Sequence, residues 1–335
     1  MDRHTAVNRT GSGRNRTDRN GEKMNITDFE KEIPEELMTP LEEEEREKET
    51  INRVSLSYWQ TSWRRLKKDK LAMAGLVVIL IMTLLAIFGP IFSPYSYDEP
   101  DFTAILQGPS MKHWFGTDIL GRDVFVRTLY GARISLTIGF AAAAINMVIG
   151  VLYGGIAGYL GGWVDMVMMR IVDILSGIPS LLYLILIMMF LGNSVQSILL
   201  AMCLTYWITT ARMVRGQIFT LREQDYALAA RVCGQSKWKI LIHHLIPNSI
   251  GNIIVTVTFL IPSAIFQEAF LSFLGIGIQV PKASWGTMCN DAIEYLMQSP
   301  HLMLFPALAI SITIFALNFI GDGLRDALDP RMSKQ

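Results

Sequence analysis

The sequence predicts an all-α membrane protein with six transmembrane helices. The chain has 335 residues, of which 51% are hydrophobic and 18% are charged, whereas charged residues make up about 25% of a typical soluble domain. Six apolar stretches are long enough to cross a ~30 Å hydrocarbon layer at ~1.5 Å per residue. Because lipid offers the backbone no hydrogen-bond partners, apolar stretches of this length must be helical.

Residues 1–56 contain no apolar run, and we expect them to form a disordered cytoplasmic tail. They also lack the hydrophobic core of a signal peptide. Three Asn-x-Thr triplets, at Asn8, Asn15 and Asn25, would accept glycans only if this tail faced a secretory lumen.

Residues 57–69 are predicted to form an amphipathic helix on the membrane surface. Trp59, Trp63 and Leu66 recur there at helical spacing, beside a basic cluster. The predicted spans follow near residues 71–92, 134–158, 166–191, 195–214, 249–274 and 301–321.

Six spans place both ends of the chain on one side of the membrane. On the side of the tail we count fifteen Lys and Arg residues near the spans, against five on the other side. The positive-inside rule therefore predicts that both termini are cytoplasmic.

Several residues inside the spans predict how the helices bend and pack. Pro179, Pro262 and Pro306 each remove a backbone hydrogen bond and predict a kink. Small residues in the second span predict close contact with a neighbouring helix; they are Ala141 to Ala144, Gly150, Gly154, Gly155 and Gly158.

Charge and cysteine content exclude other classes of protein. Acidic and basic residues balance at 30 each, so no global field favours nucleic acid or an acidic partner. Cys203, Cys233 and Cys289 are predicted in the bilayer, the inner face and the outer face, too far apart to form disulfides. His243 and His244 are adjacent, whereas a helical histidine pair binding one metal needs i, i+4 spacing, so no metal site is expected.

The connection between the fourth and fifth spans is long and contains its own helix signals. Asp225 is predicted to cap a helix over residues 226–233, and Gly234 to end that helix in the left-handed conformation. Ser236 is predicted to cap a second helix that runs to Pro247. A two-turn helix is unstable alone in water, so we expect a partner, which the alanines of the first helix would let approach closely.

This connection resembles the EAA loop of ABC-importer permeases, whose pattern is Glu-Ala-Ala-x3-Gly-x9-Ile-x-Leu-Pro. Leu228, His244 and Ile246 stand where the pattern has Glu, Ile and Leu, while the two alanines, the glycine and the proline keep their register. In that family the loop forms a coupling helix that docks in a cleft of the ATPase subunit. The resemblance therefore implies an ATPase-coupling set of Asp225, Tyr226, Ala227, Leu228, Ala229, Ala230, Arg231, Gly234 and Pro247.

Further segments are similar to the oligopeptide, dipeptide and nickel permease group, and most similar to the C-type subunit of oligopeptide and dipeptide importers. They are His113 to Asp123, Tyr130 to Leu136, Glu268 to Gly275, Ser284 to Gly286 and Gly321 to Arg331. The resemblance implies a type I importer permease with a 5+1 helix arrangement in the plasma membrane. Residues 57–133 would hold the elbow helix, first span and outer loop, residues 134–323 the permease core, and residues 324–335 a cytoplasmic tail.

The resemblance also implies which partners supply the energy. No G-x-x-x-x-G-K-[ST] phosphate loop occurs in the sequence, so ATP is not expected to bind in the usual way. The expected partners are a homologous second permease, two ABC ATPase subunits that bind ATP and Mg, and an extracytoplasmic peptide-binding lipoprotein. The chain would carry no cofactor, would not itself be an enzyme, and would translocate oligopeptides or dipeptides; a nickel-chelate permease is the alternative within the group.

Glu268 is a carboxylate well inside a predicted span, and Ser272 follows one turn later. A charge at the bilayer centre costs ~2.5 to 3.5 kcal/mol, so Glu268 should face protein or water. Either these residues line the substrate path or gate, or Glu268 hydrogen-bonds to a neighbouring helix or a partner subunit.

The predicted outer loop, residues 93–133, also allows two interpretations. It would touch a binding protein that delivers substrate, or it forms a short surface helix capped by Asp118 with solvated charges. Its candidate residues are Trp114, Gly116, Asp118, Arg122 and Asp123. At the inner start of the third span, Asp165, Arg170 and Asp173 are expected to pair with one another.

Two other function classes remain open from the sequence. An intramembrane enzyme needs facing catalytic groups, and Glu268 alone lies deep enough. An ion channel or ion-coupled carrier should show rings or chains of buried charge.

Overall fold

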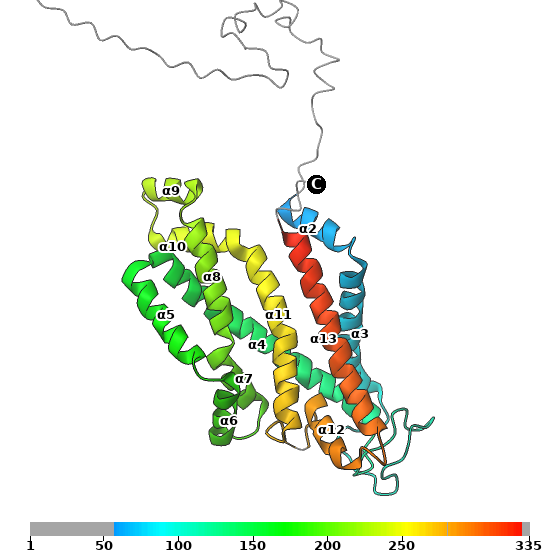
Figure 1. The fold of residues 1–335 in the computed structure, drawn as a ribbon. Helices are drawn as coiled ribbons and strands as arrows, with labels where there is room; N and C mark the ends of the chain where they lie inside the picture. The colour runs from blue at the N-terminus through cyan, green and yellow to red at the C-terminus, as the bar shows by residue number, and fades with distance from the viewer. Residues whose placement is uncertain (1–56, 280, 330–335) are drawn as a thin grey trace, which may run out of the picture. The chain divides into compact units, whose positions relative to one another are not determined.

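A computed structural model describes residues 57–279 and 281–329 (Figure 1). The predicted tail over residues 1–56 and half of the predicted C-terminal tail, residues 330–335, lie outside the described residues. The described part is helical, and the strand-like pairing within it is an isolated bridge between Thr117 and Asp123. In chain order its helices are α2 (Tyr58–Leu66), α3 (Lys70–Phe92), α4 (Val124–Leu160), α5 (Gly162–Ser176), α6 (Ser180–Leu191), α7 (Val195–Thr205), α8 (Trp207–Leu221), α9 (Asp225–Val232), α10 (Lys237–Ile240), the π-helix η3 (Leu241–Leu245), α11 (Ile246–Phe273), α12 (Trp285–Ala292), the 3-10 helix η4 (Ile293–Tyr295) and α13 (His301–Leu328).

Five continuous helical stretches in the described residues are long and apolar enough to cross a membrane. They are Lys70–Phe92, Val124–Leu160, Val195–Leu221, Lys237–Phe273 and His301–Leu328. A sixth is present if α5 and α6 are counted as one broken span, bent by 77°. Pro179, the predicted kink, lies at this break with an extended ψ of 128°. Its ring prevents the helix from continuing, so the predicted span at 166–191 is two short helices.

The second span begins about ten residues earlier than predicted. Asp123 caps α4, because its carboxylate accepts a hydrogen bond from the Val126 amide at 2.9 Å. Gly161, with φ of +64°, ends α4 in a conformation that glycine adopts without strain.

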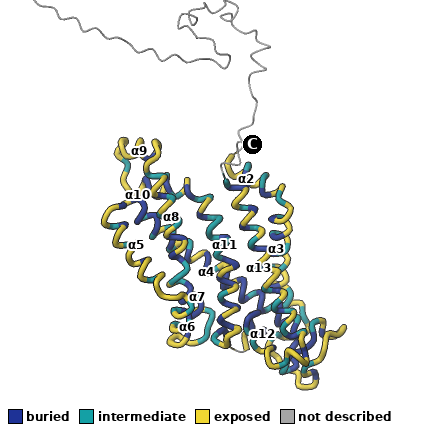
Figure 2. The backbone as a smooth tube through the Cα atoms, viewed as in Figure 1, coloured by how far each residue is buried: buried dark blue, intermediate teal, exposed yellow. Residues whose placement is uncertain are grey.

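Small residues bring α4 into direct contact with α8, as predicted. A Cβ on Gly154 would lie 2.3 Å from the Ala211 carbonyl oxygen, and one on Gly158 would lie 2.7 Å from the Arg215 oxygen. These glycines are one helical turn apart, so they form a single face against α8. Figure 2 shows many buried residues along α4, α8 and α11.

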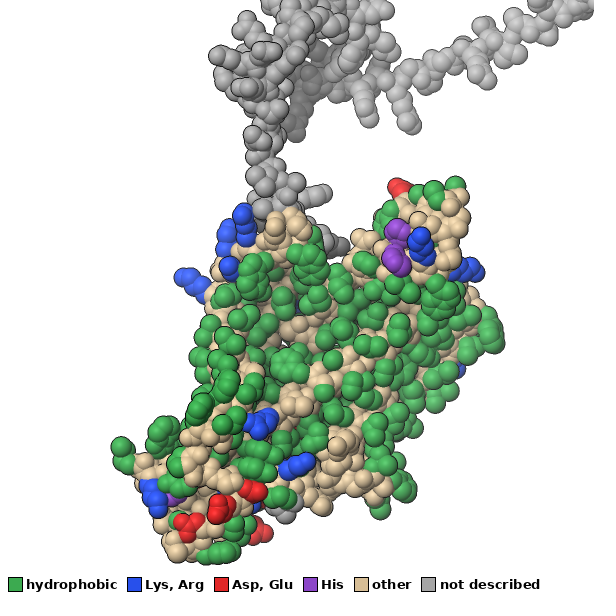
Figure 3. Space-filling model, turned by 180° about the vertical axis from the view of Figure 1, so that it is seen from behind, with side chains coloured by type: hydrophobic (Ala, Val, Ile, Leu, Met, Phe, Trp, Pro, Cys, Tyr) green, Lys and Arg blue, Asp and Glu red, His purple; other side chains and the backbone are tan. Residues whose placement is uncertain are grey.

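The amphipathic helix expected before the first span is α2. Trp59 and Trp63 are exposed and Leu66 is buried, in agreement with the predicted pattern. The Tyr58 hydroxyl donates to the Leu328 carbonyl at 3.0 Å, which attaches α2 to the end of α13. On the face seen in Figure 3, hydrophobic side chains cover the middle of the molecule and most charged side chains lie towards its two ends.

The expected pairing among Asp165, Arg170 and Asp173 is wrong. Asp165 instead forms an ion pair with Arg215 of α8, and Asp173 lies 3.0 Å from Arg212 of the same helix. Residues of α5 point towards α8 rather than along their own helix, so each carboxylate meets an arginine about 40 to 50 positions later.

Candidate transport and coupling site

The helix α9 projects from one end of the described part, opposite α12 (Figure 1). It begins at Asp225, one residue before the predicted start. Its N-cap is Gln224, so Asp225 is the first helical residue rather than the cap. There its carboxylate still interacts favourably with the positive end of the helix dipole.

Gly234 ends α9 as predicted, with φ of +74°. The Gln235 amide donates to the Ala230 carbonyl at 3.1 Å, a bond that spans the turn and satisfies an otherwise unpaired carbonyl. Arg231 points back towards the body of the chain, where it donates to the Arg222 carbonyl at 3.3 Å and covers the Tyr159 ring.

Two of the three alanines in α9 do not face a partner. Ala227 and Ala230 are buried within the chain's own core, in a cluster that also contains Tyr159 of α4 and Ile240 of α10. The expectation that the alanines allow a partner to approach is therefore wrong for these two, because their small side chains pack α9 onto the chain's own core, next to α10.

Two exposed apolar side chains nevertheless share one face of α9. Leu228 and Val232 lie one turn apart, and Val232 retains 88% of its accessible surface. Tyr226 is also exposed, on another side of the helix. Exposed apolar side chains on so short a helix favour a contact with a partner. Leu228 stands at the position of the family glutamate.

The second helix of the loop does not end at Pro247. Ser236 caps α10 as predicted, but α10, η3 and α11 run on continuously from Lys237 to Phe273. The Ile246 amide bonds to the Leu241 carbonyl, five residues back. This wider turn provides room for the ring of Pro247, which would otherwise collide with a carbonyl four residues earlier.

Glu268 lies inside α11 and is fully buried. The hydroxyls of Ser135, on α4, and Ser272 each donate to its carboxylate at 2.8 Å. The structure therefore shows the expected hydrogen bond to a neighbouring helix, while a role in the path or gate stays a prediction. Ser272 also borders a cleft of about 300 Å³ at the turn after α11.

The helix α12 packs over the Glu268 region. Trp285 is fully buried and its indole nitrogen donates to the Thr128 carbonyl of α4 at 2.9 Å. A Cβ on Gly286 would lie 2.4 Å from the Ala269 carbonyl oxygen, so α12 rests directly on the backbone of α11.

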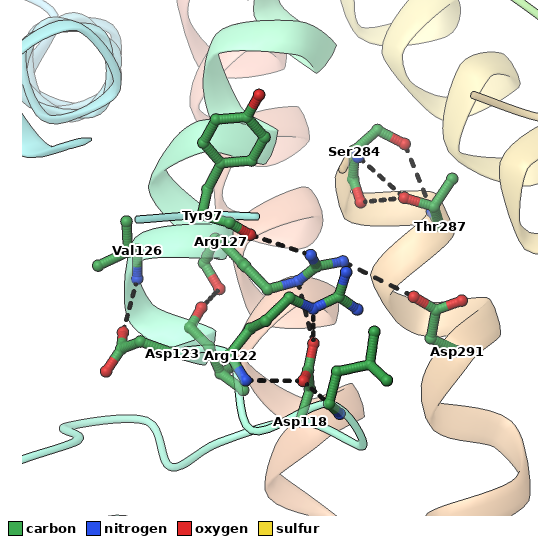
Figure 4. Close-up of polar contacts among 12 residues, drawn as sticks. Tyr97, Asp118, Arg122, Asp123, Val126, Arg127, Ser284, Thr287 and Asp291 are labelled. Atoms are coloured by element: carbon green, nitrogen blue, oxygen red, sulfur yellow. Dashed lines mark hydrogen bonds and ion pairs between the residues drawn. The ribbon is translucent and has the colours of Figure 1, made fainter. Parts of the chain in front are cut away.

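Figure 4 shows a compact ionic cluster at the start of α4. Asp118 accepts from the Arg122 Nε at 2.7 Å and lies 3.3 Å from the Arg127 Nε. Arg127 is 2% exposed; it also donates to the Tyr97 carbonyl at 3.1 Å and lies 3.7 Å from Asp291 of α12. This cluster joins the 93–123 loop to α4 and α12.

The cluster corrects one interpretation of the outer loop. Asp118 caps no helix, and the charges of Asp118, Arg122 and Asp123 are buried rather than solvated. Opposite charges within hydrogen-bond distance compensate the loss of water. Gly116 has φ of +77° and no room for a Cβ, whereas Trp114 is exposed.

A large cleft of about 1080 Å³ lies between α8, α11 and the end of α13. Its wall includes a stripe of uncharged polar side chains, which we call the polar stripe: Ser180, Thr205, Thr209, Gln217, Asn252, Thr256 and Ser263. The Asn252 amide donates to the Gln217 side-chain oxygen at 2.9 Å, which connects α11 to α8.

Sequence reasoning missed this polar stripe. Asn252 and Thr256 are one turn apart in an apolar span, and Thr209 and Gln217 are two turns apart in another. Polar residues at this spacing on a spanning helix face a protein or water surface rather than lipid. The signal was thus present, but only the fold shows that the two rows line one cleft.

Comparison with known proteins places this arrangement in a family. The family model for binding-protein-dependent transport system inner membrane components matches residues 150–334, and that for the N-terminal transmembrane domain of oligopeptide transport permease C matches residues 57–109. The chain belongs to this family of membrane transport permeases. The predicted resemblance, from about residue 57 onward, is confirmed.

Close relatives of this permease cover nearly its whole length. It is 48% identical over 304 residues to a dipeptide transport system permease protein of Bacillus subtilis, over 90% of this chain and 95% of the relative. It is also 48% identical over 302 residues to an oligopeptide transport system permease protein of the same organism, over 90% of this chain and 99% of the relative. An oligopeptide transport system permease protein of Escherichia coli is 43% identical over 277 residues, over 82% of this chain and 92% of the relative.

Proposed function

We propose that this permease translocates oligopeptides or dipeptides across the plasma membrane as one subunit of an ATP-driven importer. The observation that carries this proposal is its 48% identity, over 90% of the chain, to both a dipeptide and an oligopeptide permease. The peptide names of these relatives favour peptides over nickel chelates.

The cleft supports the proposed transport role. Its polar stripe consists of hydroxyl and amide groups, which both donate and accept hydrogen bonds. Such groups match a peptide backbone whatever its side chains are. We infer that the cleft is this subunit's share of the translocation path, completed by a homologous second permease.

The exposed apolar side chains of α9 support coupling to an ATPase. We infer that two ATPase subunits bind ATP and Mg, and that one of them covers Tyr226, Leu228 and Val232. Closure of the ATPases would move α9, and with it the continuous helix from Lys237 to Phe273 that lines the cleft. An extracytoplasmic lipoprotein would deliver the peptide to the opposite end, and both termini of the permease would be cytoplasmic.

Uptake by cells that express the complete transport complex tests this proposal. Deleting the permease gene should abolish uptake of a labelled dipeptide or pentapeptide, and the restored gene should recover it. Uptake should persist when an uncoupler collapses the proton gradient while ATP is maintained, and should stop when ATP is depleted.

Two results would contradict the proposal. Uptake that stops with the uncoupler alone would indicate an ion-coupled carrier. Loss of labelled nickel uptake on deletion, with peptide uptake unchanged, would indicate a nickel-chelate permease.

A further inference from the structure

A third cleft, of about 510 Å³, lies where α4 and α8 end beside the loop that carries α9. Three cationic side chains line it, Arg222, Arg231 and Lys237, against the single carboxylate of Glu223. That carboxylate accepts from the Arg222 Nε at 3.0 Å and is 61% exposed, so it points out towards solvent. The lining therefore carries an excess of positive charge.

Two of these cations lack acidic partners. Within residues 57–279 and 281–329, neither Arg231 nor Lys237 forms an ion pair with a carboxylate. Both side chains are exposed and line the cleft, so they are accessible to a ligand. Unpaired cations gathered around one cleft favour an anion from outside the chain.

The two guanidinium groups are held in place before any ligand binds. Arg222 donates to the Gly158 carbonyl at 2.9 Å and lies 4.0 Å over the Phe219 ring. Gly161 leaves room for this contact, since a Cβ there would lie 2.6 Å from the guanidinium. Arg231 is fixed by the Arg222 carbonyl and the Tyr159 ring. Such preorganisation lowers the entropy cost of binding.

The rim of the cleft has the features of a membrane–water interface. The spanning helix α4 ends at Leu160, which lines the cleft and is 41% exposed. Trp238 is not among the lining residues, but it follows Lys237 directly in α10 and is 57% exposed. Tryptophan and basic residues at the ends of spanning helices are typical of the headgroup layer, and basic pockets between such helices bind anionic lipid headgroups.

We propose that this cleft binds a phosphate group, and that the phosphate belongs to the headgroup of an anionic phospholipid. The arginines would hold the phosphate oxygens through paired N–H donors, as guanidinium groups do. The exposed Leu160 and Trp238 side chains would lie against the glycerol and acyl chains, which a soluble phosphate does not have. This inference does not depend on which substrate the permease carries.

The experiment compares two double variants of the assembled transport complex in lipid nanodiscs. Arg231→Gln with Lys237→Gln removes two charges from the cleft and leaves the contacts of the Arg222 guanidinium with Gly158, Glu223 and Phe219 in place. Arg64→Gln with Lys68→Gln removes one exposed arginine and one exposed lysine outside the cleft lining and is the matched control. Native mass spectrometry measures retained phosphatidylglycerol against phosphatidylcholine, and thermal unfolding is followed with added phosphatidylglycerol or inorganic phosphate.

We expect phosphatidylglycerol binding to weaken about fivefold for each cleft charge, or about 25-fold in the cleft variant, and less than about twofold in the control. Stabilisation by inorganic phosphate alone, lost in the cleft variant, would support the phosphate site and overturn the lipid as its source. Equal lipid retention in both variants would overturn the site. Loss of the ATPase subunits from the cleft variant, with lipid retained, would assign the cleft to the ATPase and also overturn the proposal.

Discussion

Glu268 is held inside a spanning helix by hydroxyl groups. Ser135 and Ser272 donate to its carboxylate, and the Ser284 hydroxyl lies 3.4 Å from that of Ser272. Three elements, α4, α11 and the cap of α12, therefore meet at one polar point. These hydrogen bonds explain how a carboxylate can be buried at this position, even if Glu268 does not contact substrate.

Replacing Glu268 tests its contribution to stability. Glu268→Ala leaves two buried hydroxyls without an acceptor, and we expect the complex to lose about 2 to 5 kcal/mol of stability. Glu268→Gln keeps one oxygen and the shape, so we expect a loss below about 1.5 kcal/mol. Thermal unfolding of the purified complex measures both; a Gln variant as unstable as the Ala variant would contradict this account.

At the scale of elements, the contact between α4 and α8 depends on glycine. Gly154 lies so close to the Ala211 carbonyl that a methyl group would collide with backbone, which cannot move aside as a side chain can. Gly216, on the exposed side of α8, differs, because a Cβ added there would have no neighbour within 4 Å.

We therefore expect opposite effects from two glycine-to-alanine changes. Gly154→Ala should destabilise the permease by about 1 to 3 kcal/mol, because α4 and α8 must separate. Gly216→Ala, in α8 of the same chain, should be neutral or stabilising by up to about 1 kcal/mol, because alanine favours the helical conformation. The melting temperatures of the two variants check this, and a Gly154→Ala variant as stable as Gly216→Ala would contradict the packing account.

Local signals in the sequence predicted the ends of helices better than the contacts between residues far apart in the chain. Gly234 and Ser236 mark the end of α9 and the start of α10 because glycine and serine act on their own backbone. The pairing of Asp165 with Arg215 was not predictable, because it depends on how α5 lies against α8. The polar stripe was missed for the same reason, since its two rows meet only in the folded chain.

The exposed residue Cys233 can be used to test the proposed contact between the whole permease and an ATPase. Cys233 follows α9 directly and is exposed, whereas Cys289 of α12 is buried. Burial raises the pKa of the Cys289 thiol to about 11, so the reactive thiolate is scarce at neutral pH and becomes common only well above pH 9.

In a Cys203→Ala background, we expect a maleimide to label Cys233 rapidly in the isolated permease at about pH 7. Labelling should slow at least about tenfold once the ATPase subunits are bound, because they would cover the end of α9. Cys289 should stay unlabelled in both preparations and is the internal control. Unchanged labelling of Cys233 in an active complex would contradict docking at α9.

The wide turn at Leu241–Leu245 sets the direction in which α9 points. A π turn holds one residue more than a regular α-helical turn, and one residue corresponds to ~100° of rotation about the helix axis. This one additional residue, just before Pro247, therefore sets the direction in which the loop leaves α11. Without it, Leu228 and Val232 would be rotated by ~100° about the axis of α11.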